Sequence, residues 1–419
     1  MRLRFPAGLI AAALVVLFFA ANGKAYWGYF SDDDLDNLAW TSYVGLDEFA
    51  RGLADLRLSP HNFRPLGHVY FWALGRLADD FYPAYVAVIQ ALHLLNAGLL
   101  FGWLRRLGFN RLPALGAMAL WTFHFALFDA VWRPMYVFDV LCGTFGLLVW
   151  HAWLSRRWIL AAALFWCAYK SKEVALFLPA GLLLYEFTHG QRRWRPLLPQ
   201  LAVAFSFGLQ ALLAPKASPT DYTLQFTAPA LAHCASFYAR NAGGWWFAAL
   251  LLPGMAEPRA WWSFGAGVAL LTPLLFLPGR RFAVYWYVPL ALLMPVVAAS
   301  FHRWRYWPAL LAAWAIFDER RLRERRRDYW PAAEQARAFY QQLGAVAPRL
   351  AGLETLYYNS VPAGTNAWGV EGMVHWRSRN PSLKVQYADP APPLAPGTAL
   401  AQWDPARRQL TVRFGSDPL

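Results

Sequence analysis

Long apolar segments alternate with short basic clusters along most of this chain. The clusters include Arg105-Arg106, Arg156-Arg157, Arg192-Arg193 and Arg280-Arg281. In a bilayer, an apolar segment of about 20 residues satisfies its backbone hydrogen bonds as a helix, and short cytoplasmic loops carry an excess of Lys and Arg. The pattern therefore predicts an all-α polytopic membrane protein.

The composition agrees with this class, because 58% of the residues are hydrophobic and only 15% are charged. The formal net charge of +14 comes largely from clusters that lie between apolar segments. We interpret them as a topology signal, so membrane lipids are predicted partners and nucleic acid is not.

About ten membrane helices are predicted, in the cytoplasmic (inner) membrane. The first, residues 6–22, follows Arg2 and Arg4 and would run outward, which leaves the loop 22–82 extracytoplasmic. Within this loop, His61 to Leu77 predicts a helix in the membrane interface. Segment 214–259 is predicted as an outer loop with a re-entrant or interfacial part near 245–252. The other predicted spans are 83–104, 112–127, 137–154, 158–169, 174–187, 196–213, 261–277, 282–299 and 307–317.

Three regions follow from this reading. Residues 1–317 are predicted to form a transmembrane domain, 318–327 a basic linker, and 328–419 a small soluble α/β domain. The Arg-rich linker puts the start of the last domain in the cytoplasm, and no later apolar segment could carry it back.

An acidic cluster, Asp32-Asp33-Asp34, follows the first apolar segment. Asp is a good helix N-cap, so a solvated cap is one interpretation. The other is a general base, since a carboxylate at the edge of a cavity can accept the proton of an acceptor hydroxyl.

Further polar residues fall on the same predicted outer face. Some have a structural alternative: Arg64 could snorkel to the headgroups, His93 could bond neighbouring helices, and Lys170 to Glu173 could be a hydrated loop. Lysines in an outer turn nevertheless oppose the usual charge bias and suggest a local anion. The residues are Arg64 and His68, His93 and Asn96 on one helix face, His124 with Asp129, Arg133 and Asp139, and Lys170 to Glu173, which includes Lys172.

The turn from His302 to Pro308 repeats this anomaly. Arg303 and Arg305 alternate with aromatic residues, in a segment predicted to be outside the cell. Such a pattern suits a phosphate or pyrophosphate bound by two N–H groups of a guanidinium beneath an aromatic ring.

Taken in order, these motifs resemble the GT-C superfamily over residues 1 to about 310. The motifs are the paired aspartate, Arg64-Pro65-Leu66, the His93-x-x-Asn96 helix, His124 followed by an acid, Ser171-Lys172-Glu173 and the Arg303-Trp304 to Pro308 turn. This superfamily comprises integral-membrane glycosyltransferases that use polyprenyl-phosphate sugars. The chain is most similar to bacterial relatives of protein O-mannosyltransferases and to their tetratricopeptide-bearing relatives.

The resemblance implies residue roles. The catalytic aspartate would be Asp33, with Asp34 beside it and Asp32 as the rival, and the phosphate side would be Lys172, Glu173 and Arg303. Two departures are a missing membrane segment after Arg327 and a short final domain without repeats. Relatives place the final domain outside, whereas the basic linker indicates the cytoplasm.

The implied reaction is inverting sugar transfer at the extracytoplasmic face. Asp33 would deprotonate an acceptor on a lipid, glycan or protein, and Arg303, Arg305 and Lys172 would meet the leaving phosphate. A divalent metal near Asp34 is possible, and no other cofactor is predicted. Arg64, His68, His93, Asn96, His124 and Asp129 would line the acceptor cavity. A lipid-linked sugar flippase and a non-catalytic membrane assembly protein are the alternatives.

Overall fold

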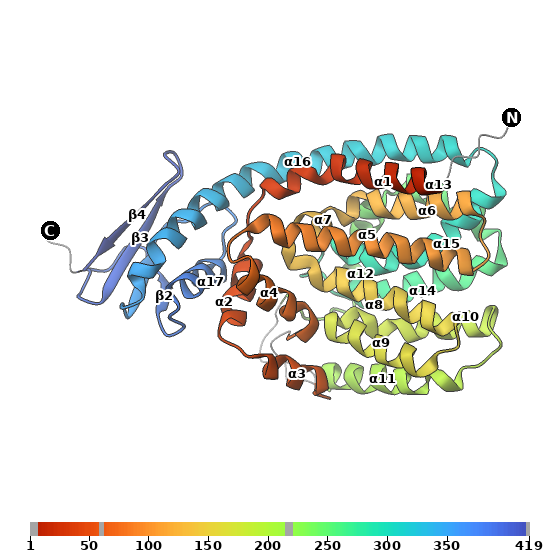
Figure 1. Cartoon of the computed structure of the whole chain (residues 1–419), viewed down its shortest axis with the longest axis horizontal. Coiled ribbons are helices and arrows are strands. Elements are labelled where there is room, and N and C mark those ends of the chain that lie inside the picture. Colours follow the sequence, from red (N-terminus) through yellow and green to blue (C-terminus); the bar gives the residue numbers. More distant parts are fainter. Residues whose placement is uncertain (1–6, 58–62, 214–220, 416–419) are drawn as a thin grey trace.

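The computed structural model describes residues 7–57, 63–213 and 221–415. It is mostly helical: a bundle of helices carries a small four-stranded sheet at one end (Figure 1). The helical class and the small C-terminal sheet were thus predicted correctly. Arg2, Arg4 and His61, on which part of the predicted topology depends, lie outside the described residues.

The bundle is built from α1 (Ala7–Asn22), α5 (Tyr82–Arg106), α6 (Arg111–Phe123), α7 (Phe128–Trp132), α8 (Val137–Leu154), α9 (Trp158–Ser171), α10 (Leu178–Thr188), α11 (Leu198–Leu213), α12 (Ala228–Ala242), α13 (Trp245–Met255), α14 (Trp261–Leu271) and α15 (Tyr287–Arg303). Short 3-10 turns join or extend these helices: η1 (Gly23–Trp27), η2 (Phe125–Leu127), η3 (Pro134–Tyr136), η4 (Glu173–Phe177), η5 (Arg195–Leu197), η6 (Pro258–Ala260), η7 (Thr272–Phe276) and η8 (Ala283–Trp286).

Several of these helices could cross a bilayer. Among the described residues, four are long and apolar enough: Tyr82–Arg106, Pro134–Leu154, Arg195–Leu213 and Ala283–Arg303. A fifth is obtained if α6 and the following η2–α7 segment, bent by 44°, count as one broken span. By this criterion the count is lower than the ten predicted, because the remaining apolar helices are shorter.

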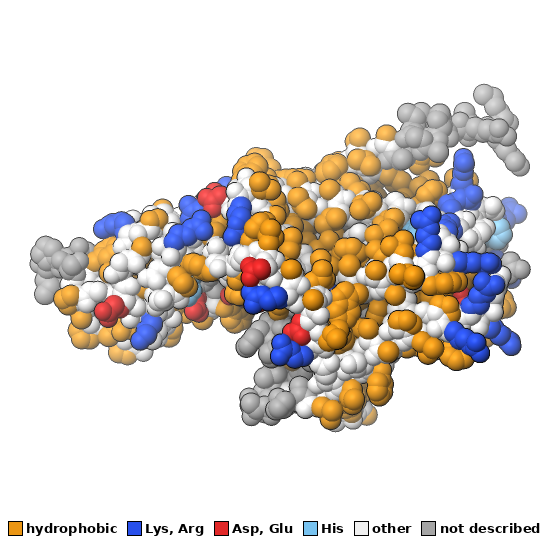
Figure 2. Space-filling model, turned by 60° about the horizontal axis from the view of Figure 1, so that its bottom comes forward, with side chains coloured by type: hydrophobic (Ala, Val, Ile, Leu, Met, Phe, Trp, Pro, Cys, Tyr) orange, Lys and Arg blue, Asp and Glu red, His pale blue; other side chains and the backbone are white. Residues whose placement is uncertain are grey.

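Burial separates central from peripheral helices. The apolar window of α15 is 94% buried within the protein, whereas that of α11 is only 17% buried. Hydrophobic side chains cover much of the flank of the bundle in Figure 2. A bundle with apolar side chains both inside and outside is typical of a membrane protein, in which lipid replaces water around the helices.

The two ends of the bundle differ. We call the end that carries α2 (Asp32–Ser42), α3 (Leu46–Ala54) and α4 (Pro65–Leu77) the α2 end (Figure 1). Arginine and lysine side chains gather at the opposite end, which we call the basic end (Figure 2). There Arg106, at the end of α5, donates to the His151 carbonyl at 2.8 Å and to Ser155 Oγ at 2.7 Å.

The pair α12–α13 connects the two ends, where the sequence predicted an outer loop. Near the start of α12, His233 contacts Arg281 at the α2 end. Beyond the break at Gly243-Gly244, α13 lies along α15, and Ser300 Oγ donates to the Leu251 carbonyl at 3.4 Å. Because this passage was missed, the directions predicted for α14 and α15 are reversed.

Helix α16 (Trp307–Val346) is one continuous helix of 40 residues. The sequence predicts a membrane helix that ends at Phe317 and a linker over 318–327, but both segments belong to α16. The helix starts at the basic end, passes along the bundle and continues into the C-terminal region (Figure 1). Residues 328–419 therefore begin at the α2 end and not at the basic end.

The C-terminal region packs α17 (Ala367–Ser378) against α2 and carries a sheet of order β2-β1-β3-β4. A further turn, η9 (Ala347–Leu350), precedes the sheet. Strand β1 pairs in parallel with β2 and β3, and β3 pairs antiparallel with β4. The strands are β1 (Thr355–Tyr358), β2 (Lys384–Tyr387), β3 (Thr398–Asp404) and β4 (Gln409–Phe414).

Cysteine labelling in intact cells tests this arrangement. Ser382 is exposed in the C-terminal region, which lies at the α2 end. Because the charge bias predicts the basic end in the cytoplasm, we expect the α2 end outside and the variant Ser382→Cys to react with a membrane-impermeant maleimide. The matched variant Ser155→Cys, exposed at the basic end, should react only after permeabilisation. The three native cysteines are replaced by serine in both. Labelling of both variants from the same side would contradict the arrangement.

Candidate functional site

A cavity of about 710 Å³ lies at the α2 end, between the helical bundle and the C-terminal region. Its walls come from α2, the turn before α4, the η3–α8 junction, the α9–η4 junction, segment 280–285, α16 and the loop before α17. Sequence segments far apart thus converge on one hollow, as the sequence analysis expected for Asp32, Asp33, Arg64, His68 and Lys172, all of which line it.

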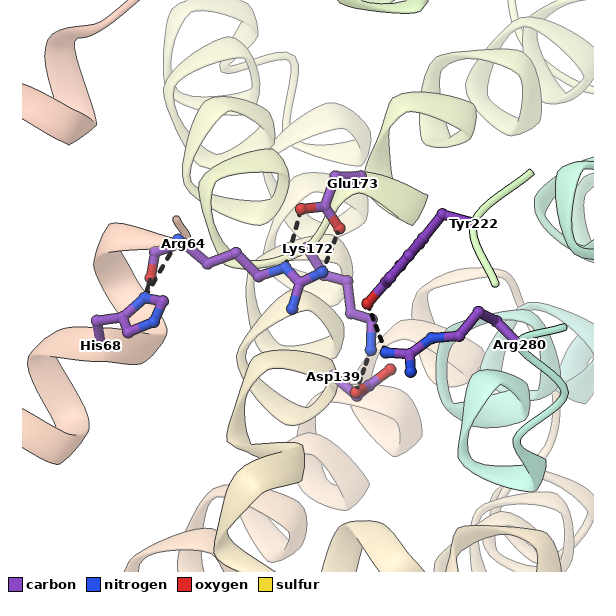
Figure 3. A network of polar contacts seen from close by, with 7 residues as sticks. All are labelled: Arg64, His68, Asp139, Lys172, Glu173, Tyr222 and Arg280. Atoms are coloured by element: carbon purple, nitrogen blue, oxygen red, sulfur yellow. Dashed lines mark hydrogen bonds and ion pairs between the residues drawn. The ribbon is translucent and has the colours of Figure 1, made fainter. Parts of the chain in front are cut away.

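One wall carries a network of paired charges (Figure 3). Arg64 bonds both oxygens of Glu173 through one edge of its guanidinium, Nε to Oε1 at 2.8 Å and Nη2 to Oε2 at 2.9 Å. Lys172 Nζ lies 2.6 Å from Asp139 Oδ2, and the exposed fractions of these two side chains are only 12% and 5%. Each of these cations is therefore compensated by a carboxylate of the protein itself, as buried charges require.

The same network fixes the state of His68. Its Nδ1 lies 2.8 Å from the Arg64 carbonyl oxygen. Burial is the main cause that lowers the pKa of His68 to about 4, and the neighbouring Arg64 charge lowers it further. Burial also lowers the pKa of Arg64, but pairing with Glu173 outweighs it and keeps the pKa above its ordinary value. At neutral pH this wall thus presents a neutral imidazole and charged guanidinium.

Arg280 differs from the other cations of the cavity. Its guanidinium donates to the Tyr222 hydroxyl and lies 4.4 Å from the centre of the Tyr222 ring. Its Nε is buried without a hydrogen-bond partner, and no carboxylate pairs with it among the described residues. A guanidinium with unused donors at a cavity wall is suited to binding an anion.

The acidic cluster forms the facing part of the cavity, and its three members have different surroundings. Asp32 accepts hydrogen bonds from the backbone N–H of Asn366 at 2.9 Å, from its Nδ2 at 2.6 Å and from the Tyr340 hydroxyl at 2.5 Å. Asp33 accepts one side-chain bond, from Trp368 Nε1 to Oδ1 at 2.8 Å. Asp32 is therefore occupied by the C-terminal region, whereas no residue within the described ranges bonds the second oxygen of Asp33, which lines the cavity.

Asp34 does not line the cavity, although it was predicted beside the catalytic acid. It closes a capping box at the start of α2, in which its Oδ2 accepts from the Ser31 backbone N–H at 2.7 Å and from Ser31 Oγ at 2.8 Å. Its side chain is fully buried. Asp34 therefore takes part in the helix cap, which was the structural alternative to a general base.

The described residues also do not fit a metal bound near Asp34. No group of three His, Cys, Asp or Glu residues within the described ranges is arranged to hold a metal ion. The capping box uses one oxygen of Asp34, and the other is buried without a partner. We therefore derive no step through a metal.

The buried Asp34 predicts a pH-dependent stability. Burial raises its pKa to about 7, although the bonds from Ser31 oppose this, whereas an unfolded Asp titrates near 3.9. Its stabilising contribution is therefore complete below about pH 4 and is lost as the pH rises through about 7. Asp34→Asn keeps an oxygen for Ser31 and removes the titration. We expect the melting temperature of the variant, relative to wild type, to rise between pH 5 and pH 8; a constant difference would contradict this.

Arg303 and Arg305 do not join the cavity. The turn that contains them follows α15 at the basic end, where His302 Nδ1 lies 3.4 Å from the Asn110 amide nitrogen, just before α6. Arg303 Nη1 lies 3.6 Å from Glu257 Oε2. Their predicted phosphate-binding role depended on an outer position, and the passage of α12–α13 through the bundle places them at the other end.

His93, Asn96 and His124 are also outside the cavity. The ring of His93 bonds the Tyr287 hydroxyl at 2.9 Å and the Thr122 carbonyl at 3.0 Å, and Asn96 donates to the same hydroxyl at 3.0 Å. These contacts join α5 to α6 and α15. His124 Nδ1 accepts from the Ala126 backbone N–H at 3.1 Å, where α6 ends and η2 begins. His93 thus has the interhelical role that was its structural alternative, and Asn96 and His124 bond neighbouring backbone or side-chain groups away from the cavity.

Asp129 is next to the cavity but does not line it. It lies 3.3 Å from Arg133 Nε, and Arg133 forms part of the wall above the Tyr329 ring. Sequence reasoning missed three other wall residues: Arg280, Asn366 and Trp368. Arg280 was treated as a topology signal. The loop around Asn366 contains no motif that predicts a functional site.

No known protein family matches the chain, and no curated protein or solved structure is significantly similar to it. Any functional conclusion therefore depends on the cavity itself.

Proposed function

We propose that this protein is an integral-membrane glycosyltransferase of the GT-C type, which transfers a sugar from a polyprenyl-phosphate carrier to an acceptor hydroxyl. One observation carries the proposal: the carboxylate of Asp33 and the guanidinium of Arg280 line the same cavity at one end of an apolar helix bundle. In the part of the chain that the structure describes, one Asp33 oxygen has no bonding partner and Arg280 has no carboxylate partner. Such a cavity offers a base and an anion site to a substrate with a lipid tail.

In the proposed reaction, Asp33 accepts the proton of the acceptor hydroxyl. The acceptor oxygen attacks the anomeric carbon on the face opposite the phosphate and forms the new C–O bond. The bond between the anomeric carbon and the phosphate oxygen breaks, and the polyprenyl phosphate leaves with the electron pair. The configuration of the sugar is inverted in this single displacement.

Arg280 would stabilise the leaving phosphate, whose negative charge increases as the bond breaks. Lys172 would assist, since an ammonium has three N–H donors and Asp139 is bonded to Lys172 Nζ through one oxygen. The Arg64–Glu173 pair would hold the neighbouring backbone, since the Nε–Nη2 edge of the guanidinium is bonded to both oxygens of the carboxylate. These roles replace those predicted for Arg303 and Arg305.

We infer that the cavity opens at the extracytoplasmic face of the cytoplasmic membrane. The support is the charge distribution, since arginines gather at the end opposite the cavity and such residues are retained in the cytoplasm (Figure 2). A polyprenyl-phosphate donor would enter from the surrounding lipid.

The test uses the purified full chain in lipid nanodiscs and in vesicles. It is incubated with a radiolabelled polyprenyl-phosphate sugar and a cell-envelope extract as acceptor. Label in the acceptor fraction would support the glycosyltransferase. Movement of label across vesicles without transfer would indicate the flippase, and neither activity would indicate the assembly protein.

A further inference from the structure

The segment 363–368 comprises the loop before α17 and the first two residues of α17, and we call it the loop 363–368. Its residues that line the cavity are Ala363, Gly364, Thr365, Asn366 and Trp368. Gly364 has φ +84°, which a residue with a side chain rarely adopts, so the loop turns back sharply there. Both donors of Asn366 bond Asp32 Oδ2 and hold the loop against α2.

Trp368 is the large apolar side chain of this loop. Its indole N–H is satisfied by Asp33, yet 47% of the residue remains exposed. An exposed tryptophan whose single donor is already used can offer only its ring surface to a ligand. That ring is held next to the free oxygen of Asp33, where the acceptor hydroxyl has to lie in the proposed reaction.

The charge of the surrounding wall limits the chemistry of the ligand. Asp32, Asp33 and Asp36 line this side of the cavity, and its lining residues from the C-terminal region carry no charge. An anionic acceptor, such as a phospholipid headgroup, would be repelled by these carboxylates. A neutral molecule with hydroxyl groups on one side and a C–H surface on another would be matched.

We propose that the loop 363–368 is the acceptor subsite and that the acceptor is a carbohydrate. The inference rests on the proposed function and adds the acceptor class. The ring of Trp368 packs against the C–H face of a sugar, while Asn37, Thr365 and the free oxygen of Asp33 bond its hydroxyls. The C-terminal region thus supplies one half of the site and the membrane bundle the other.

Two variants separate ring packing from positioning of Asp33. Trp368→Ala removes both the ring and the N–H donor, whereas Trp368→Phe keeps an aromatic ring and removes the donor. We expect Trp368→Ala to raise the KM for the acceptor by about tenfold or more and Trp368→Phe by less than about threefold. Tyr387 is exposed on β2 away from the cavity. Tyr387→Ala is therefore the matched control, and its acceptor KM should equal that of wild type.

The readouts are transfer to the envelope extract and slow hydrolysis of the same radiolabelled donor by water. Hydrolysis does not need the acceptor subsite, so Trp368→Ala should lose less hydrolysis than transfer, and Tyr387→Ala should match wild type in both reactions. An unchanged acceptor KM in Trp368→Ala would overturn the proposal. Equal losses of hydrolysis and transfer would also overturn it, because Trp368 would then act on Asp33 or on folding.

The acceptor class is tested on the extract. Periodate cleaves vicinal diols and should abolish acceptor activity, whereas exhaustive proteinase digestion should leave it intact. The opposite result would mean a protein acceptor and would overturn the carbohydrate assignment without affecting the glycosyltransferase itself. Absence of both hydrolysis and transfer in wild type would instead reject the proposed function.

Discussion

Replacing Asp33 by asparagine should reduce the turnover of sugar transfer on the order of 100-fold or more. Asparagine keeps the size of the side chain and an oxygen that can accept from Trp368 Nε1, but it cannot take the proton of the acceptor. Turnover is measured on protein whose melting temperature equals that of wild type, so that loss of folding is excluded.

The neighbouring acids are the controls for this prediction. Asp32→Asn should reduce turnover much less, because the amide oxygen can still accept from Asn366 while the amide nitrogen donates to the Tyr340 hydroxyl oxygen. Asp34→Asn should also reduce it less, since Asp34 is a buried cap and not a cavity residue. Full activity of Asp33→Asn would remove the base from the mechanism and favour the flippase or the assembly protein.

The second large effect is expected at Arg280. Its replacement by alanine should weaken donor binding by about 2 kcal/mol or more, which corresponds to a roughly 30-fold rise in Kd. Lysine should restore only part of the affinity, because an ammonium lacks the planar donors of a guanidinium. Binding is measured by titrating nanodisc-embedded protein with the polyprenyl-phosphate sugar.

Arg303→Ala is the matched control for Arg280→Ala. Arg303 lies at the basic end beside Glu257, so its removal should leave the donor Kd unchanged. If instead Arg303→Ala weakened donor binding and Arg280→Ala did not, the assignment from the sequence motif would be preferred over the one from the cavity.

The contrast between these two arginines shows what the sequence could predict. Long apolar helices such as α5 have a strong signal, and the spacing of His93 and Asn96 placed them correctly on one face. Helix α12 gives only a weak sequence signal for a membrane span, because its 15 residues include His233, Arg240 and Asn241. Missing this one passage reversed the direction of every later helix and exchanged the positions of Arg280 and Arg303.

The remaining parts of the site depend on contacts between distant residues. Asp33 was assigned as the base on the resemblance, and the cavity supports the same choice for a different reason: its neighbours are already bonded. The partner of Asp32 could not be predicted, because a single sequence contains no sign that Asn366 contacts it. The pairs Arg64–Glu173 and Lys172–Asp139 likewise join residues whose proximity arises only when helices pack.

The contact of α17 with α2 has a consequence for the timing of biogenesis. Asp32 and Asn366 are 334 residues apart in the chain. At about 5–20 residues per second, a ribosome needs roughly 20–70 s to reach Asn366 after it has made Asp32. During that interval α2, which bears the proposed base Asp33, lacks the part of the cavity wall that the C-terminal region supplies. If the proposed function holds, a nascent chain that stalls or is cut before α17 would insert its bundle without the acceptor subsite, so only a molecule translated beyond α17 could transfer sugar to the acceptor.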